Sequence, residues 1–211
     1  MWATYTGLML VSPRSLGLSV RADGGRIQTV AGMLLLNQSA EQAFVTLANM
    51  LNRPLPLAFF TQDDGAVTIP PFPCHPAFLT GAQISRSYAL FLKAFQYKLP
   101  SLYRHIHQNL RIGPALYLEP MFLTLFSLQC PADITSRIWD IYSFEGDSIL
   151  VRTAVAIMAV LESKLYGDQH DVLRILGWNA GILPLGKDDD FIAAVRSAGR
   201  EETPAPVTDQ F

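Results

Sequence analysis

The stretch SRIWDIYSFEGDSILVRTAV, residues 136–155, places several charged side chains around an otherwise apolar segment. Arg137 and Asp140 are three residues apart, a spacing at which two side chains can pair on one face of a helix. Residues 145–147, Glu-Gly-Asp, have the composition of a turn followed by the cap of a second helix. The residue types therefore predict a corner between two helices, with an ion pair between Arg137 and Asp140 and with Trp139 facing the core.

The composition bounds the class of protein. The chain has 211 residues, of which 50% are hydrophobic and 16% are charged, so it is long and apolar enough for one domain with a buried core. A net charge of −2 excludes the electrostatic footprint of a nucleic-acid-binding protein. The Lys and Arg residues form no run in the sequence that would predict binding to an anionic membrane. Two cysteines without C-x-x-C spacing favour a reduced, cytosolic protein.

Neither a membrane-spanning segment nor a clear targeting signal is predicted. The longest apolar run, residues 149–161, contains Arg152 and is shorter than the roughly 20 residues that cross a bilayer. It is therefore expected to be a buried helix. Residues 1–25 contain Arg and Ser and no acid before Asp23, a faint likeness to a transit peptide, but Pro13 interrupts their apolar part. The alternative is a leader that does not join the core of the domain.

Residues that typically start or end a helix are frequent along the chain. Ser39 followed by Gln42 predicts a capped helix that ends near Asn52, before Pro54. Its apolar face is expected to contain Phe44, Leu47, Ala48 and Leu51, and the preceding segment 30–37 is a short buried helix or a strand. Residues 53–82 are expected to form a loop, with a proline-rich insertion at 66–82. From residue 83 onward the pattern is helical. The first helix is expected to have Tyr88, Phe91, Leu92, Phe95 and Leu99 on one face, and further helices start at Pro100, Pro114 and Pro131.

The C-terminal third continues this pattern. Asp147 is expected to cap a long helix that ends at Gly167, and Asp168 a short helix that ends at Gly177. Residues 179–211 are assigned to a tail with one helix at 188–198, whose first turn carries three aspartates where negative charge is favourable. Because alternating β-branched strand patterns are nearly absent, the predicted fold is all-α, with several helices joined by short loops.

No residue pattern predicts catalysis or a bound cofactor. His105 and His107 are two residues apart, so on a helix they point in different directions, and they are expected to be exposed rather than metal ligands. Cys130 lies in a Leu- and Phe-rich segment and is expected to be an inert small hydrophobe rather than a nucleophile. The chain contains neither G-x-x-x-x-G-K-[ST] nor G-x-G-x-x-G, so no nucleotide-binding loop of those kinds is predicted.

Five segments in a fixed order carry a family resemblance. They are AGMLLLN (31–37), AFVTLANMLNRPLPLAFF (43–60), LPSLYRHI (99–106), LYLEPMFLTLFS (116–127) and RIWDIYSFEGDSILVRTAVAI (137–157). In this order they resemble the TBC domain of Rab GTPase-activating proteins, and the segment at 48–60 is most similar to the autophagy- and recycling-endosome-associated members. The resemblance covers roughly residues 29–178 and implies an all-helical domain at 26–178 that is incomplete at its N-terminal end.

The resemblance also implies a function. Members of the family accelerate GTP hydrolysis on Rab proteins by supplying an Arg and a Gln, which stabilise charge and orient the attacking water. GTP and Mg²⁺ then belong to the partner GTPase, and the chain itself needs no cofactor. The implied partners are a Rab-family GTPase and a membrane-associated scaffold, and the implied location is cytoplasmic and peripheral on endomembranes.

Neither catalytic side chain carries over to this sequence. The position of the family's Gln corresponds to Gly25; Gln28 is three residues too late and would lie on another helix face. The family's Arg motif lies further upstream, where residues 1–25 match nothing in the family. Met121 stands where the family usually has Trp, and Pro120 beside it is expected to disturb its helix. As written, the chain is predicted to be inactive as a GTPase activator.

Two functional interpretations follow. The first is a Rab GTPase activator represented by part of its domain, as a regulator of a GTPase rather than an enzyme itself. The second is a non-catalytic helical module that binds a Rab or a scaffold protein. In both, Arg137, Trp139, Asp140 and Gly146 match a family signature outside the catalytic pair, and they are expected to be mainly architectural, with a contribution to the GTPase-facing surface.

Overall fold

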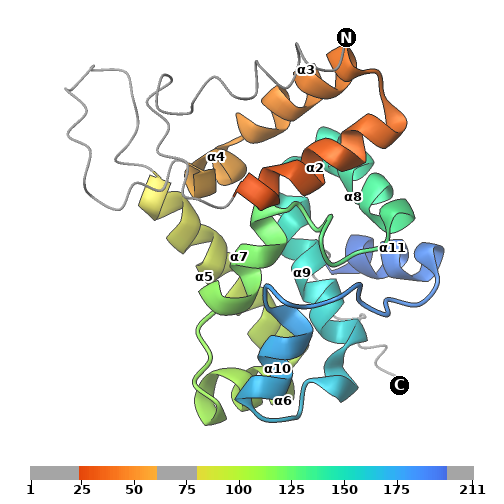
Figure 1. Ribbon diagram of the computed structural model, residues 1–211. Helices are drawn as coiled ribbons and strands as arrows, with labels where there is room; N and C mark the ends of the chain where they lie inside the picture. Colours follow the sequence, from red (N-terminus) through yellow and green to blue (C-terminus); the bar gives the residue numbers. More distant parts are fainter. Residues whose placement is uncertain (1–23, 61–79, 199–211) are drawn as a thin grey trace, which may run out of the picture.

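The computed structural model describes residues 24–60 and 80–198, which form helices and no strand (Figure 1). The elements are α2 (Gly24–Asn37), α3 (Ala40–Leu51), α4 (Pro54–Phe60), α5 (Thr80–Lys98), α6 (Pro100–Tyr103), the π-helix η3 (Arg104–Asn109), α7 (Ala115–Leu123), α8 (Ala132–Glu145), α9 (Ser148–Val160), the 3₁₀-helix η4 (Glu162–Lys164), α10 (Gln169–Leu176) and α11 (Asp188–Ser197). The all-α prediction is confirmed. The predicted leader up to residue 23, the insertion at 66–79 and the end of the tail from 199 lie outside the described residues.

Helix α9 forms the centre of the molecule. Eight of its residues are buried, because its sequence SILVRTAVAIMAV is apolar on nearly every face. It contacts α5, α7, α8 and α11, so elements from both halves of the chain surround it (Figure 1). The predicted helix from Asp147 to Gly167 is shorter than expected: α9 ends at Val160, and the single 3₁₀ turn of η4 follows.

An aromatic cluster fills the space between α5, α7 and the segment after α7. Phe91 and Phe95 on α5 are fully buried, as the predicted face of this helix requires. The rings of Phe91 and Tyr117 lie 5.8 Å apart, and those of Phe122 and Phe126 lie 6.2 Å apart, both in edge-to-face geometry. These residues give the core its largest side chains and fix α5 against α7.

Local helix signals are confirmed where their partners lie within one turn. The Ser39 hydroxyl accepts from the backbone N–H of Gln42 at 3.4 Å, and the Asp168 carboxylate accepts from that of Asp171 at 2.8 Å. Pro100 is the first residue of α6, and Pro114 and Pro131 directly precede α7 and α8. These signals are predictable because donor and acceptor are only three residues apart.

Helix α4 contradicts the prediction of a loop at 53–82. Its sequence PLPLAFF begins with a proline at the first helical position, where the missing N–H costs nothing. Leu55, Ala58 and Phe59 are buried, and α4 packs against α3, α5 and α7. Seven residues with two prolines give too little periodicity for a sequence prediction, and tertiary burial stabilises the helix instead.

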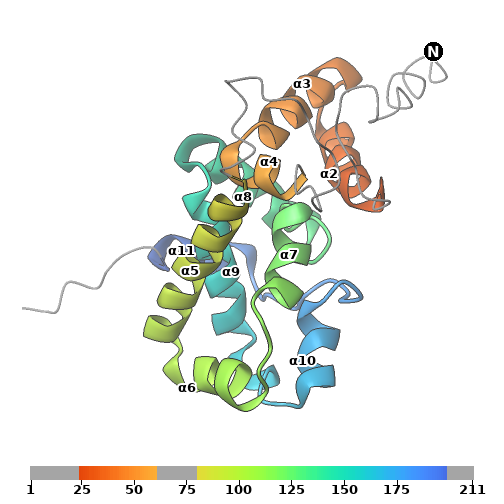
Figure 2. The same ribbon diagram turned by 90° about the vertical axis from the view of Figure 1, so that its left-hand side faces the viewer.

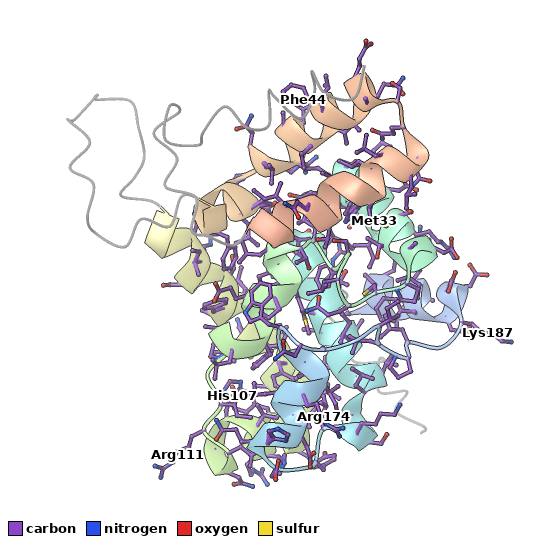
Figure 3. All side chains as sticks on the ribbon, viewed as in Figure 1. Met33, Phe44, His107, Arg111, Arg174 and Lys187 are labelled. Carbon is purple, nitrogen blue, oxygen red and sulfur yellow. The ribbon has the colours of Figure 1, made fainter. Side chains whose placement is uncertain are left out.

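Helices α2 and α3 form an antiparallel hairpin at the top of the view in Figure 1. Segment 30–37 is helical rather than a strand, and it buries Val30 and Leu34 while Leu36 is 77% exposed. The predicted face of α3 is partly wrong. Ala43, Leu47 and Met50 are its buried residues, whereas Phe44 is 57% exposed and is labelled in Figure 3. The packed face is the one that meets α2 and α4, and Phe44 lies outside it.

Helix α7 ends at Leu123. Leu125 and Phe126 follow with φ values of 47° and 66°, in the left-handed region that stops a helix. Pro120 was expected to disturb this helix. It lies inside α7, which continues for three residues beyond it. The Pro120 carbonyl accepts from the hydroxyl of Thr124 at 2.8 Å.

The segment assigned to a tail joins the core as far as residue 198. Helix α11 forms as predicted and packs on α8 and α9, burying Phe191, Ile192 and Val195. Before it, the N–H of Leu183 donates to the Gln129 carbonyl at 2.7 Å. The packed unit therefore extends past the predicted boundary at 178. Among the described helices, none is long and apolar enough to cross a membrane.

Candidate functional site

The four signature residues lie on α8 and at its C-terminal end. Trp139 is only 6% exposed, and its indole Nε1–H donates to the Leu125 carbonyl at 2.8 Å. This bond holds the left-handed turn that follows α7 against α8. Trp139 thus faces the core, as the sequence predicted, and its hydrogen-bond partner is 14 residues away.

Arg137 does not pair with Asp140, so that prediction is wrong. Its Nη1 lies 2.6 Å from Oδ1 of Asp189 in the first turn of α11. The pair joins α8 to α11 at the surface, where the two side chains are 43% and 88% exposed. A side chain from a neighbouring helix has displaced the local i,i+3 partner, because α11 packs beside α8.

Asp140 is the signature residue without a structural role in the described part of the chain. It is exposed on α8, and no described residue forms a hydrogen bond or ion pair with it. A carboxylate in this position is free to meet a group on another molecule.

Gly146 ends α8 in a conformation that requires glycine. Its φ of 75° lies in the left-handed region, and its N–H donates to the Tyr142 carbonyl at 3.0 Å. An added Cβ would meet only Arg53 Nη1 at 3.6 Å, an ordinary contact, so backbone strain rather than space restricts this position. The turn directs the chain from α8 into α9.

Asp147 caps a helix, but not the one predicted. Its side chain makes no cap bond to α9. Instead Oδ2 accepts from the backbone N–H of Leu55 in the first turn of α4 at 2.9 Å, and Oδ1 accepts from the Tyr142 hydroxyl at 3.2 Å. The N-terminus of α4 thus finds its cap 92 residues along the chain.

Arg53 forms the second link between α4 and α8. Its Nη2 donates to the Ser143 carbonyl at 2.9 Å, and its guanidinium lies 4.6 Å from the centroid of the Tyr142 ring, a cation–π distance. Burial raises the pKa of Tyr142, and the negative charge of Asp147 raises it further, while Arg53 acts in the opposite direction. The phenol therefore stays protonated and donates to Asp147.

We call this group of Arg53, Leu55, Tyr142, Ser143, Gly146 and Asp147 the corner. Beside it, Arg152 on α9 forms an ion pair with Glu145. Arg53, Asp147 and Arg152 each have partners within the fold. The corner therefore holds α4 against α8 and α9, and we assign it no acid–base chemistry. Sequence analysis missed Arg53 and Tyr142; Pro54, a helix-start residue directly after Arg53, was the available signal.

The two histidines are not exposed, so the prediction of exposed side chains is wrong. His105 and His107 are half-buried, and the segment that carries them is a π-helix rather than the end of an α-helix. Nε2 of His105 lies 2.9 Å from the Gly167 carbonyl, and Nε2 of His107 lies 2.9 Å from the Tyr117 hydroxyl. Burial lowers the pKa of His107, which favours its neutral form. Both histidines therefore tie the lower end of the molecule together, where Figure 3 labels His107.

The other candidate residues also have structural roles. Cys130 is 3% exposed, and burial raises the pKa of its thiol to about 12, as expected for an inert hydrophobe. Asp168, His170 and Asp171 bring their ligand atoms within 4.8 Å of one another at the surface. One Asp168 oxygen already caps α10, and exposed clusters of this kind are common without a metal, so we assign no ion to it.

The positions compared with the family's catalytic Gln lie at the start of α2. Gly25 is in its first turn, and Gln28 is exposed one turn later. The side chain of Arg26 lies outside the described residues.

Comparisons with known proteins match this helical unit. The model of the Rab-GTPase-TBC domain matches residues 27–166. Human TBC1 domain family member 14 is 33% identical over 148 residues, which are 69% of this chain and 19% of that protein. TBC1 domain family member 12 of Xenopus tropicalis is 33% identical over 158 residues, 74% of this chain and 20% of that protein. A TBC domain-containing protein of Schizosaccharomyces pombe is 28% identical over 167 residues, 77% of this chain and 31% of that protein. The chain thus spans between 19% and 31% of the length of these relatives.

Proposed function

The chain belongs to the Rab-GTPase-TBC domain family, and we propose that it binds a Rab-class GTPase as part of a GTPase-activating module. In this proposal the described residues supply the scaffold and a contact surface, and they supply neither catalytic side chain. The chain is then a regulator of a GTPase rather than an enzyme. GTP and Mg²⁺ belong to the partner.

One observation carries the proposal. The family match at 27–166 extends from within α2 to η4, and the signature residues in it lie on α8 and at its C-terminal end, where Gly146 belongs to the corner. Arg137, Trp139 and Gly146 have partners or backbone roles inside the fold. Asp140 alone among the four is exposed and unpaired within the described part of the chain, which makes it our candidate for contact with the GTPase.

Lack of catalysis is the second part of the proposal. A catalytic arginine must be free to enter the partner's nucleotide site, where it is worth about 10³–10⁵ in rate. Arg53, Arg137, Arg152 and Arg174 are each engaged with a group of the same chain. Arg86, Arg104, Arg111 and Arg196 are exposed. By resemblance, none of these eight stands at the position of the family's catalytic arginine, which lies upstream of α2. By resemblance, the position of the catalytic glutamine is Gly25, which has no side chain.

The test measures binding and hydrolysis separately. The full chain is titrated against a panel of Rab proteins loaded with a non-hydrolysable GTP analogue, and single-turnover GTP hydrolysis is followed with the same panel. We expect saturable binding to at least one Rab and stimulation of hydrolysis below about a hundredfold, because no finger is supplied. Binding to no member of the panel would overturn the proposed partner. Stimulation above a hundredfold would overturn the proposed lack of catalysis.

A charge change at Asp140 tests the contact itself. Asp140→Lys is expected to weaken Rab binding by about tenfold or more, since reversing an interfacial charge costs attraction and adds repulsion. Asp190→Lys, which reverses an exposed acid on α11, is the matched control and should change binding less than twofold. Equal effects of the two variants would remove Asp140 from the interface.

A further inference from the structure

Basic residues that are dispersed in the sequence come together on the outer face of α5. Arg86, Leu90, Lys93 and Tyr97 follow one another at intervals of four, three and four residues, which places them on one side of the helix. All four are exposed, Leu90 by 52% and Tyr97 by 71%. We call these four residues the α5 stripe. The opposite face of α5, with Phe91 and Phe95, is in the core.

Within the described residues, 24–60 and 80–198, the positive charge of the stripe has no local counter-charge. Residues 80–118 contain five basic residues and no Asp or Glu. Neither Arg86 nor Lys93 forms an ion pair with any described residue, and the sequences of α4, α6 and α9, which pack against α5, contain no acid. Glu119 of α7 acts on Tyr88, which lies on another side of α5.

The charge continues beyond the C-terminal end of α5. Arg104 and Arg111 are exposed and also unpaired within the described residues, and Figure 3 shows Arg111 directed away from the body of the molecule. Lys98 is the exception, because its Nζ donates to the Ser197 carbonyl at 3.0 Å. In the view of Figure 2, α5 runs down one side of the molecule to α6 at its lower end. Acids of this end are Glu162 on η4, Asp171 on α10 and Asp168, which caps α10.

We propose that the α5 stripe binds an anionic lipid surface. Lys and Arg extend charged ends toward headgroups while their stems contact apolar material, and Tyr and Leu suit the boundary between headgroups and acyl chains. The stripe alternates these two kinds of side chain along a single line. No hydrogen bond to another described residue holds its cations in a fixed geometry, which fits a diffuse plane of negative charge better than a discrete acidic side chain on a protein.

Vesicle co-sedimentation of the full chain tests the proposal. Vesicles of phosphatidylcholine alone are compared with vesicles that also contain phosphatidylserine, at low and at high salt. We expect at least about tenfold stronger binding to the anionic vesicles at low salt, with most of the difference lost at high salt. Equal binding to both kinds of vesicle would overturn the proposal.

Two matched double variants assign the effect to the stripe. Arg86→Glu with Lys93→Glu is expected to reduce binding on anionic vesicles by about tenfold or more, to the level of neutral vesicles. Lys187→Glu with Arg196→Glu makes the same charge change at and within α11 and should alter binding less than about twofold. All four positions are exposed, so a thermal melt of each variant should match the parent. Similar binding by both double variants would show that only net charge matters and would overturn the assignment.

The apolar part of the stripe has its own readout. Tyr97→Trp is expected to show a blue shift of fluorescence on anionic vesicles that exceeds the shift of the parent chain, because the new indole enters the headgroup region. An unshifted spectrum would overturn insertion of the stripe. If the Arg86 and Lys93 double variant lost Rab binding while the parent ignored vesicles, the stripe would be a protein contact and the lipid proposal would be wrong. Asp140→Lys should leave vesicle binding unchanged, which separates this inference from the proposed function.

Discussion

The corner and the α2–α3 hairpin are built in opposite ways. In the corner, the bonds from Arg53 to Ser143 and from Leu55 to Asp147 join residues 90 and 92 positions apart. In the hairpin, the hydroxyl of Thr46 donates to Gln38 only eight residues away, at 2.9 Å. The corner buries an aromatic ring between its charges, whereas the hairpin leaves Leu36 and Phe44 largely exposed.

The difference shows which region is tied to distant parts of the fold. Long-range bonds in the corner hold α4 against α8 and α9, so the loss of one partner affects several helices at once. Exposed side chains on the hairpin contact little of the core, so their removal costs little. Matched substitutions in the two regions turn this contrast into numbers.

The largest difference is expected between two aromatic residues. Trp139→Ala should lower the free energy of unfolding by about 3–5 kcal/mol, because it removes a buried indole and leaves a cavity. Phe44→Ala in the hairpin should cost less than about 0.5 kcal/mol, because the ring is mostly exposed. Urea unfolding measures both. Losses of equal size would mean that the hairpin is packed as tightly around Phe44 as α8 is around Trp139.

The second-largest difference is expected between two acidic residues, Asp147 of the corner and Glu41 of the hairpin. Asp147→Ala should cost about 1–3 kcal/mol, because the N–H of Leu55 and the hydroxyl of Tyr142 both lose their acceptor. Glu41→Ala, which removes an acid from the first turn of α3, should cost about 0.3–1 kcal/mol. Hydrogen exchange adds a local readout, since the amide of Leu55 should exchange faster in Asp147→Ala only. Unchanged protection of that amide would argue against the long-range cap.

Two glycines should respond with opposite signs. Gly146→Ala should destabilise the chain by about 1–2 kcal/mol, because an L-residue is strained at its φ of 75°. Gly32→Ala lies within α2, where an added Cβ meets nothing within 4 Å, and should stabilise it by about 0.4–1 kcal/mol. Thermal melts monitored by circular dichroism distinguish the two. A stabilising Gly146→Ala would contradict the left-handed turn at the corner.

The smallest effect concerns the surface ion pair. A double-mutant cycle of Arg137→Ala and Asp189→Ala should give a coupling of about 0.2–1 kcal/mol that decreases with added salt, because the pair is exposed. The same cycle with Asp140→Ala should give a coupling near zero. A larger coupling to Asp140 than to Asp189 would restore the local pair that the sequence predicted.

Predictions from the sequence held where the interacting groups are neighbours along the chain. The caps at Ser39 and Asp168 and the buried Phe91 and Phe95 of α5 followed from spacing alone. The same reasoning failed for Arg137 and for Phe44, because helical spacing shows which side chains share a face without showing which element covers that face. For α4, the seven residues PLPLAFF carried too short a pattern to predict a helix.

For the candidate site too, local features were predictable from the sequence and long-range contacts were not. The sequence predicted that Trp139 faces the core and that residues 145–147 form a turn, and the order of its segments pointed to the family that the comparisons show. It gave no signal that Arg53 would meet Tyr142, because this contact depends on which helices pack together.

The sequence by itself determined the all-α class, most helix starts, the burial of α9 and the family, because periodicity, caps and apolar content act within a few residues. Only the tertiary structure decided the partners of Arg137 and Asp147, the existence of α4 and the exposure of Asp140. These depend on hydrogen bonds and ion pairs between residues that are far apart in the chain. Their partners are chosen by proximity in space, which no local pattern encodes.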